Sequence, residues 1–96
     1  MPDTFQLSTV TIMRRALPHG FPNWEDAAAH HWDVNKRQMV ASVADANDRK
    51  ALLIPILLDH ADDGTLYVLD GVRRVLVGHT LMLPVPIEIV NDRGAA

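Results

Sequence analysis

The sequence predicts an α+β fold, with a small mixed sheet and helices packed on it. Short runs rich in β-branched and aliphatic residues alternate with longer segments of helical periodicity, which is the pattern of such folds. The chain has 96 residues, of which 48% are hydrophobic and 22% charged, a balance typical of a domain with its own core. We therefore expect a single domain over residues 1–96.

The first expected element is a strand over residues 6–13, because this run is rich in β-branched residues. Residues 14–22 contain Pro18, Gly20 and Pro22. Because proline and glycine interrupt regular structure, this segment is predicted to be a loop.

Two helices are predicted next. Asn23 can cap a helix over residues 24–32, and Asp33 can cap a second helix over residues 34–47. In the second segment apolar or small residues recur at helical spacing, at Met39, Val40, Val43 and Ala46 or Asn47. This stripe predicts an amphipathic helix that lies on the sheet.

A hairpin is predicted after these helices. The apolar run over residues 53–58 indicates a strand, and Pro55 within it favours an edge position or the start of the strand. Residues 59–64 form the predicted turn, in which we expect Asp63 and Gly64 to supply the positive-φ positions.

The hairpin is followed by a helix and a last strand. Residues 66–69 complete the hairpin, and the helix begins at Gly71 and must end by Leu83 because prolines follow. Residues 87–90 are the predicted last strand, and residues 91–96 are expected to be a frayed tail.

The corner between the strand over residues 66–69 and the following helix is the predicted site. A glycine there lets the backbone turn, and the free N–H groups of the first helical turn favour an anion. The guanidinium groups of Arg73 and Arg74 suit phosphate. We therefore predict a phosphate site at Gly71, Arg73 and Arg74, with Asp70 beside them.

The alternative is a purely structural corner. Asp70 could pair with an arginine, orient Mg²⁺ or cap the helix, and we favour capping.

Metal binding is an alternative that we do not favour. Two groups could hold an ion: Asp26, His30, His31 and Asp33 around the first helix, and Asp59, Asp62 and Asp63 in the turn. Adjacent helical histidines point about 100° apart, and turns favour aspartate for backbone reasons alone. We therefore expect no metal site and assign no catalytic residue.

Composition excludes several classes of protein. The chain has no cysteine, which excludes disulfides, thiolate metal sites and cysteine catalysis and fits a cytoplasmic protein. The net charge of −3 and the pI near 5.9 disfavour a long nucleic-acid track. The apolar runs are too short to span a membrane, and the first residues lack a signal sequence. We therefore expect no membrane partner.

Four stretches in a fixed order carry a family resemblance. They are a helix that ends near Asn47, an Ile-Pro-Ile-Leu-Leu strand at 54–58, a strand and Gly-Val-Arg-Arg corner at 67–74, and a Pro-Val-Pro-Ile-Glu-Ile-Val segment at 84–90. Over residues 33–90 this order resembles the ParB N-terminal domain, also called the ParB/sulfiredoxin fold. The family has a Pro-Ile-x-Val strand, a strand that ends in Gly-x-x-Arg, a helix and a closing strand around Val-Pro-x-x-Val.

The resemblance implies a bound nucleotide or nucleic-acid phosphate. In the family the Gly-x-x-Arg corner contacts CTP in partition proteins and ATP in sulfiredoxins, and some members are described as nucleases. Carried over, this places Gly71, Arg73 and Arg74 at the phosphates of CTP or ATP, with Mg²⁺. Sulfiredoxin chemistry needs a cysteine where this chain has Val72, so sulfinic-acid reduction is excluded. Because the sequence ends at Ala96, we expect a small stand-alone protein, of a kind associated with plasmids and phages, and no complete partition clamp.

Three functions stay open. We favour a ParB-like binding module that holds a phosphate at the 71–74 corner and acts through a protein partner or as a homodimer. The second is a Mg²⁺-dependent nuclease or nucleotide hydrolase at the same corner, which would need a positioned base and a metal cage. The third is a degenerate protein-interaction scaffold, because a fold does not fix a function.

Overall fold

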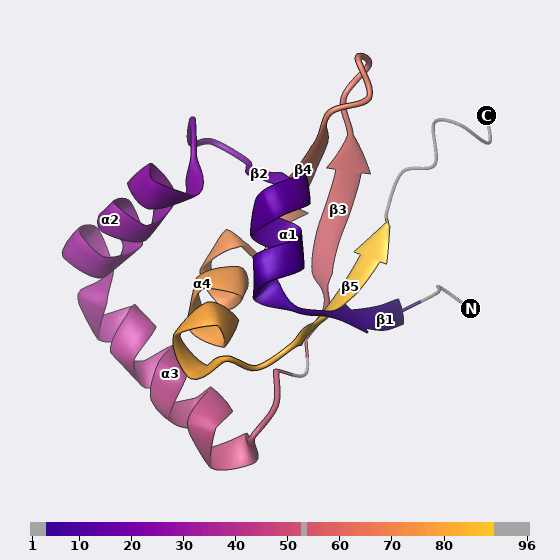
Figure 1. The fold of residues 1–96 in the computed structure, drawn as a ribbon. Coiled ribbons are helices and arrows are strands. Elements are labelled where there is room, and N and C mark those ends of the chain that lie inside the picture. The colour runs from indigo at the N-terminus through magenta and orange to yellow at the C-terminus, as the bar shows by residue number, and fades with distance from the viewer. Residues whose placement is uncertain (1–3, 53, 90–96) are drawn as a thin grey trace.

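The computed structural model describes residues 4–52 and 54–89, and the predicted α+β class is confirmed (Figure 1). Nothing is described for residues 90–96, where the predicted tail lies, or for Leu53. In chain order the described elements are β1 (Thr4–Leu7), α1 (Thr9–Arg15), β2 (Leu17–Pro18), α2 (Trp24–Val34), α3 (Lys36–Arg49), β3 (Ile56–His60), β4 (Leu66–Asp70), α4 (Val72–Leu81) and β5 (Val85–Ile89).

The strands form one mixed sheet in the order β1-β5-β3-β4-β2. β3 and β4 make an antiparallel hairpin, and α4 crosses over so that β5 lies parallel to β3. β1 pairs antiparallel with β5 at one edge, and β2 pairs parallel with β4 at the other. Because β2 and β4 are parallel, the segment after β2 and the start of α4 lie at the same end of the sheet.

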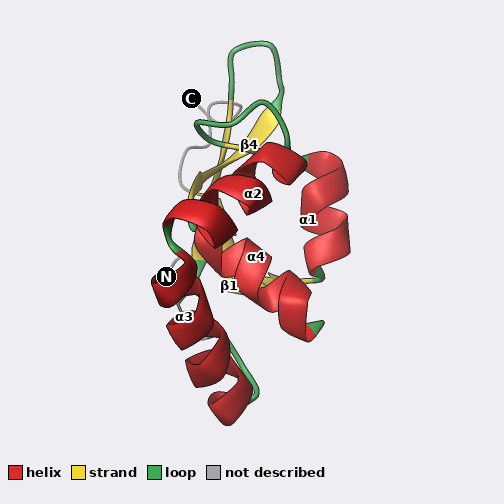
Figure 2. Cartoon of the chain, turned by 90° about the vertical axis from the view of Figure 1, so that its left-hand side faces the viewer, coloured by secondary structure: helices red, strands yellow, loops and turns green. Residues whose placement is uncertain are grey.

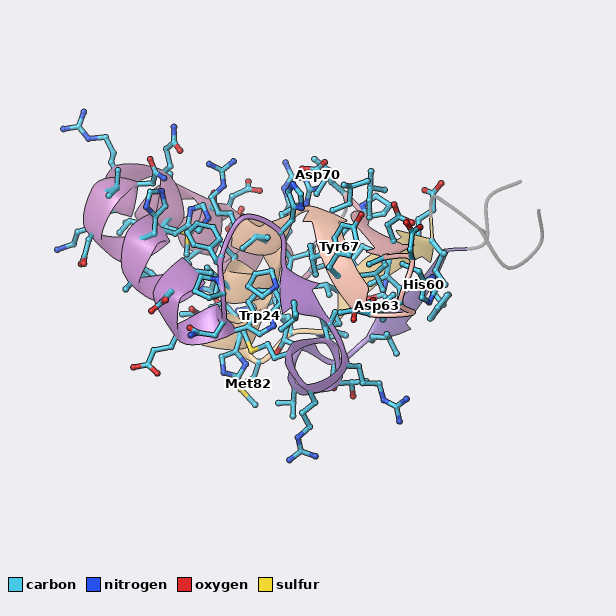
Figure 3. The ribbon with its side chains drawn as sticks, turned by 90° about the horizontal axis from the view of Figure 1, so that it is seen from above. Trp24, His60, Asp63, Tyr67, Asp70 and Met82 are labelled. Atoms are coloured by element: carbon cyan, nitrogen blue, oxygen red, sulfur yellow. The ribbon has the colours of Figure 1, made fainter. Side chains whose placement is uncertain are left out.

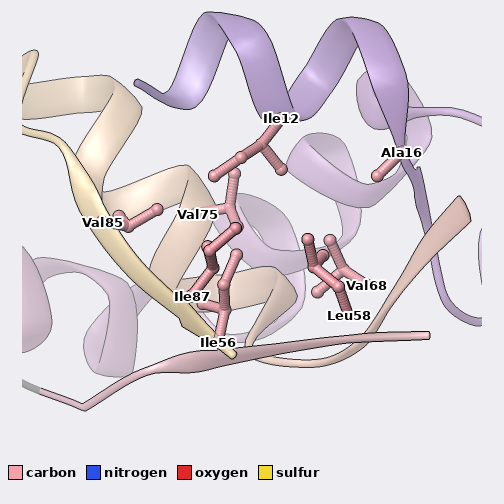
Figure 4. Packing of buried hydrophobic residues seen from close by; sticks show 8 residues of the cluster. All are labelled: Ile12, Ala16, Ile56, Leu58, Val68, Val75, Val85 and Ile87. Atoms are coloured by element: carbon pink, nitrogen blue, oxygen red, sulfur yellow. The ribbon is translucent and has the colours of Figure 1, made fainter. Parts of the chain in front are cut away.

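The core lies in two layers around α4. Between the sheet and helices α1 and α4, buried side chains form a first cluster (Figure 4): Ile12, Ala16, Ile56, Leu58, Val68, Val75, Val85 and Ile87. A second cluster joins α3 to the other side of α4: Met39, Ala46, Leu76 and Val77. Seen from the helical side, the helices stand in front of the strands (Figure 2). α4 is therefore the central helix, buried from two directions.

The strand predicted over residues 6–13 is wrong for most of its length. Only the run up to Leu7 is extended, and α1 begins after Ser8, whose hydroxyl accepts a hydrogen bond from the Thr11 amide at 3.2 Å. Thr9 and Ile12 lie three residues apart and are buried. The cap and this buried helical stripe outweigh the strand propensity of β-branched residues. The loop predicted next also contains the short strand β2.

The first of the two predicted helix caps is confirmed, and the second is wrong. The Asn23 side chain accepts a hydrogen bond from the Asp26 amide at 2.7 Å at the start of α2. Asp33 caps nothing, because α2 continues through it to Val34. α3 begins after Asn35, whose side chain makes no capping hydrogen bond.

The predicted position of α3 on the sheet is also wrong. Its buried residues Met39 and Ala46 pack on α4, and α2 flanks it. Val40, placed on the buried stripe by its spacing, is 52% exposed. A stripe at helical spacing predicts that a helix has a buried side, and it does not say which element covers that side.

The predicted hairpin is present, but the position of its first strand and the backbone of its turn differ from the prediction. β3 starts at Ile56 and lies inside the sheet, so Pro55 marks the start of a strand and not an edge. In the turn only Gly64 has a positive φ, of +88°. Asp63 instead accepts a hydrogen bond from the Thr65 amide at 2.8 Å.

The last helix and strand are confirmed with shifted bounds. α4 ends at Leu81, before the prolines, and β5 begins at Val85, two residues earlier than expected. Val90, the end of the predicted strand, lies outside the described residues. None of the helices in the described part of the chain combines the length and the apolar character that a bilayer crossing requires.

Candidate functional site

The corner between β4 and α4 depends on Gly71. Its φ is +106°, a left-handed conformation, and a Cβ there would lie 2.6 Å from Cγ2 of Ile56 on β3. Gly71 is the N-cap residue of α4 and provides no side chain, so the amides of the first turn have no side-chain cap. Such amides favour a negatively charged ligand.

Asp70 does not cap α4, so the favoured interpretation of this residue was wrong. Its Oδ2 instead accepts a hydrogen bond from Nη2 of Arg74 at 3.4 Å, one helical turn later. The pairing alternative is the one observed.

Arg74 is engaged within the chain. Its Nη2 also donates to the carbonyl oxygen of Pro55 at 3.2 Å, which ties α4 to the segment before β3. The side chain is only 26% exposed, and its Nε is buried without a hydrogen-bond partner among the described residues. Arg74 therefore has a structural role in addition to any contact with a ligand.

Arg73 is the more available of the two arginines. It is exposed, and its Nη1 donates to Oε1 of Gln38 on α3 at 2.7 Å. Gln38 is neutral, so the positive charge of Arg73 has no carboxylate partner within residues 4–52 and 54–89. The guanidinium can therefore offer its charge to an anion in front of the helix.

A hollow of about 270 Å³ lies in front of this corner, and we call it the corner hollow. All the residues predicted for the site line it, namely Asp70, Gly71, Arg73 and Arg74. The structure thus brings the predicted residues to one concave surface. Across from them the wall is formed by three residues that the prediction of the site missed, His19, Phe21 and His31.

His19 reaches the corner hollow because β2 runs parallel to β4. Its amide donates to the Val68 carbonyl at 3.1 Å, which carries the chain past the end of β2 and towards the corner. Its ring stacks on Tyr67, with centroids 5.7 Å apart. Tyr67 and Asp70, both on β4, are labelled in Figure 3. The Tyr67 hydroxyl in turn donates to Oδ2 of buried Asp59 at 3.3 Å. Nothing in the sequence predicted that His19 would lie at the corner, because residues 14–22 were predicted to be a loop and the pairing of β2 with β4 was not foreseen.

His31 reaches the corner hollow from α2. Its ring lies against Phe21 at 5.8 Å and against His30 at 5.4 Å, measured between centroids. Burial, then the neighbouring His30, then Arg73 lower the pKa of the His31 ring below its ordinary value of 6.5. Its Nδ1 is buried and has no hydrogen-bond partner among the described residues. From the sequence, His31 was weighed only as a metal ligand. In the structure it lines the corner hollow together with the predicted site residues.

A second hollow of about 480 Å³ lies on the other side of Arg73 and Arg74, between α3 and α4, and we call it the α3 hollow. Small and aliphatic residues such as Ala41, Leu52 and Val77 line it. Its further arginine, Arg49, is paired with Asp45 on the same helix at 3.2 Å. This hollow is larger than the corner hollow and has a more apolar lining, in which Arg49, Arg73 and Arg74 stand against Asp45.

No group of three or more histidine, aspartate or glutamate side chains within residues 4–52 and 54–89 is arranged to hold a metal ion. Asp59, one of the metal candidates, accepts a hydrogen bond from the His60 amide at 2.7 Å as well as the one from Tyr67. At the corner, arginine and histidine side chains and the uncapped amides of α4 line one hollow, and such groups favour an anion.

Comparisons with protein-family models, with curated proteins and with solved structures find no match. The resemblance to the ParB N-terminal domain stays a prediction from the residues. Any function has to be argued from the corner itself.

Proposed function

We propose that this chain is a cytoplasmic, ParB-like binding module that holds a phosphate group of a nucleotide or nucleic acid in the corner hollow. One observation carries the proposal. The uncapped start of α4, the charge of Arg73 and the rings of His19 and His31 all line the same hollow. Helix amides, a guanidinium and imidazoles are the groups that proteins use to bind phosphate.

The charge distribution favours a small ligand over a long polymer. The chain as a whole carries a net charge of −3, whereas the corner hollow has two arginines against one aspartate. A local positive site on an acidic protein suits one phosphate group or a short run of them. CTP and ATP, with Mg²⁺ bound to their phosphates, are the first ligands to test because the family resemblance implies them.

The size of the corner hollow bears on how such a ligand would fit. A volume of about 270 Å³ is below the usual range of about 300–1,000 Å³ for sites that enclose an organic molecule. We infer that the hollow takes the phosphate end of the ligand. The rest of a nucleotide would lie outside it, past the exposed Arg73.

A protein partner is the second part of the proposal. Ile54, before β3, is 62% exposed. It lines the α3 hollow, which adjoins the phosphate site through Arg73. An exposed apolar side chain in a hollow beside the site supports a role for that side of the molecule in binding a protein, either another copy of the chain or a different one.

Thermal unfolding tests the proposal. The probes are pyrophosphate, CTP, ATP and a short DNA duplex, each with Mg²⁺. A ligand at about 100 times its Kd stabilises the fold by about 2.7 kcal/mol. For a domain of this size that is a rise in Tm of about 10–20 °C. We expect at least one phosphate compound to give such a rise.

Two arginine variants locate the effect. Arg73→Gln removes the unpaired charge of the corner hollow, and we expect it to raise Kd about tenfold or more, the loss typical of one charged hydrogen bond. Arg49→Gln is the matched control, because Arg49 is an exposed arginine that lines only the α3 hollow. The proposal is wrong if no probe raises Tm, or if the two variants weaken binding equally. Mg²⁺-dependent consumption of a probe would favour the enzyme alternative.

A further inference from the structure

The corner hollow combines one available arginine with two histidine rings. Apart from the histidines, its charged groups are two arginines and one aspartate, and that aspartate, Asp70, is paired with Arg74. The hollow therefore offers about one unit of positive charge, that of Arg73. A terminal phosphate carries close to two negative charges at pH 7. The arginine alone does not balance such a ligand.

We propose that the corner hollow takes up a proton on His31 when it binds a doubly charged oxyanion, so that binding strengthens as the pH falls. This inference rests on the proposed phosphate site and adds a requirement that the corner residues alone do not have. It makes His31 a part of the binding site that is charged only when the ligand is present.

The surroundings of His31 explain why its ring is neutral before an anion binds. Two basic or titratable residues act on it, His30 on its own helix and Arg73 on α4, and His19 after β2 lines the same hollow. Asp70, the acidic residue that lines the hollow, is paired with Arg74. Burial and the positive neighbours lower the pKa of His31, so the ring is neutral at physiological pH in the absence of an anion.

A bound anion reverses this balance. A double negative charge in the hollow offsets the positive field of Arg73 and offers an acceptor to a ring N–H, so the pKa of His31 rises. His31 has a buried Nδ1 without a partner among the described residues, so the ring is not committed to another hydrogen bond. Between the pKa of the free state and that of the bound state, binding takes up one proton. In that window the association constant increases up to about tenfold for each unit by which the pH falls.

The affinity changes with pH only between the two pKa values of His31, that of the free state and that of the bound state. Below the pKa of the free state His31 is already protonated, and affinity no longer changes with pH. Above the pKa of the bound state His31 stays neutral in both states, and affinity is again constant but lower. The same linkage requires the anion to raise the pKa of His31.

Sulfate is the probe, because it keeps its double charge throughout the range of about pH 5 to 8 in which histidine titrates. The measurement is an NMR titration of the folded protein with sulfate at several pH values. Backbone amide shifts of Gly71 and Arg73 report the Kd, and the His31 ring proton reports its pKa with and without saturating sulfate. His31→Gln removes the proposed proton site. His30→Gln is the matched control, because His30 is the adjacent, exposed histidine and does not line the hollow. Since His30 lowers the pKa of His31, this variant shifts the pH window upward but keeps the proton site.

We expect the wild-type protein and the His30→Gln variant to bind sulfate more tightly as the pH falls. We expect the His31→Gln variant to lose most of that dependence while it keeps the wild-type affinity near pH 8. The ring titration of wild-type His31 needs no variant, so it decides the question even if His31→Gln does not fold. An unchanged His31 pKa at saturating sulfate would overturn the proton coupling and leave the phosphate site standing. The absence of sulfate binding at every pH, with no difference between the wild type and Arg73→Gln, would overturn both.

Discussion

At the scale of single residues, the two adjacent arginines of the corner differ in their exposure and in their hydrogen-bond partners. Arg73 is exposed and bound to the neutral Gln38, whereas Arg74 is partly buried and donates to Pro55 and Asp70. The difference arises because consecutive helical residues point in directions about 100° apart. Arg74 faces the strand side of α4, and Arg73 faces the hollow and α3. The sequence predicted both for the phosphate, and only the fold distinguishes their surroundings.

Gly71 supports a prediction at the same scale. Gly71→Ala and Gly64→Ala both place a side chain at a positive φ, which costs about 1–2 kcal/mol. Only at Gly71 would the new Cβ also overlap a neighbour, Ile56, since Gly64 has nothing within 4 Å. Overpacking of this kind costs about 1–3 kcal/mol. We expect urea unfolding to show that Gly71→Ala loses more stability than Gly64→Ala by about that amount. Equal losses would mean that the close approach of α4 to β3 is not as described.

At the scale of elements, prediction succeeded where a local signal and burial agree. The Asn23 cap, the hairpin turn at Gly64 and the strand, glycine and helix around Gly71 all follow from residues close together in the chain. The prediction failed for α1, whose β-branched residues favour a strand. Thr9 and Ile12 are buried together on one side of a helix, and this burial decides the outcome. Contacts between distant segments determine that burial, and spacing within one segment does not report them.

At this scale, two adjacent residues of α3 are predicted to differ in their contribution to stability. Met39 and Val40 are adjacent and both were placed on the buried stripe, but Met39 is 0% exposed and Val40 is 52% exposed. Met39→Ala would leave a cavity between α3 and α4, and we expect it to cost about 2–5 kcal/mol. Val40→Ala lies on the surface and is expected to change stability by no more than about 0.5 kcal/mol. Unfolding by urea measures both. A larger loss for Val40→Ala would indicate that α3 packs through its other side.

At the scale of the whole molecule, the fold assembles the lining of the corner hollow from three parts of the chain. The parallel pairing of β2 with β4 brings His19 to the corner, and the packing of α2 brings His31 there. Sequence reasoning named the contiguous part of the lining of the corner hollow, Asp70 to Arg74. It missed the other part, because no spacing in the sequence relates residues 19 and 31 to a helix that starts at Val72. The wall of histidines is a product of tertiary packing alone.

The central claim is that a phosphate group binds at the start of α4 in the corner hollow. The most direct measurement is an NMR titration with pyrophosphate that follows the backbone amides of the whole chain. We expect the largest shift changes at Gly71, Val72 and Arg73 and at the facing residues His19 and His31, with little change along the 41–49 part of α3. We also expect Arg73→Gln to weaken the response about tenfold or more. Changes centred on the α3 hollow, or none at all at millimolar pyrophosphate, would contradict the claim.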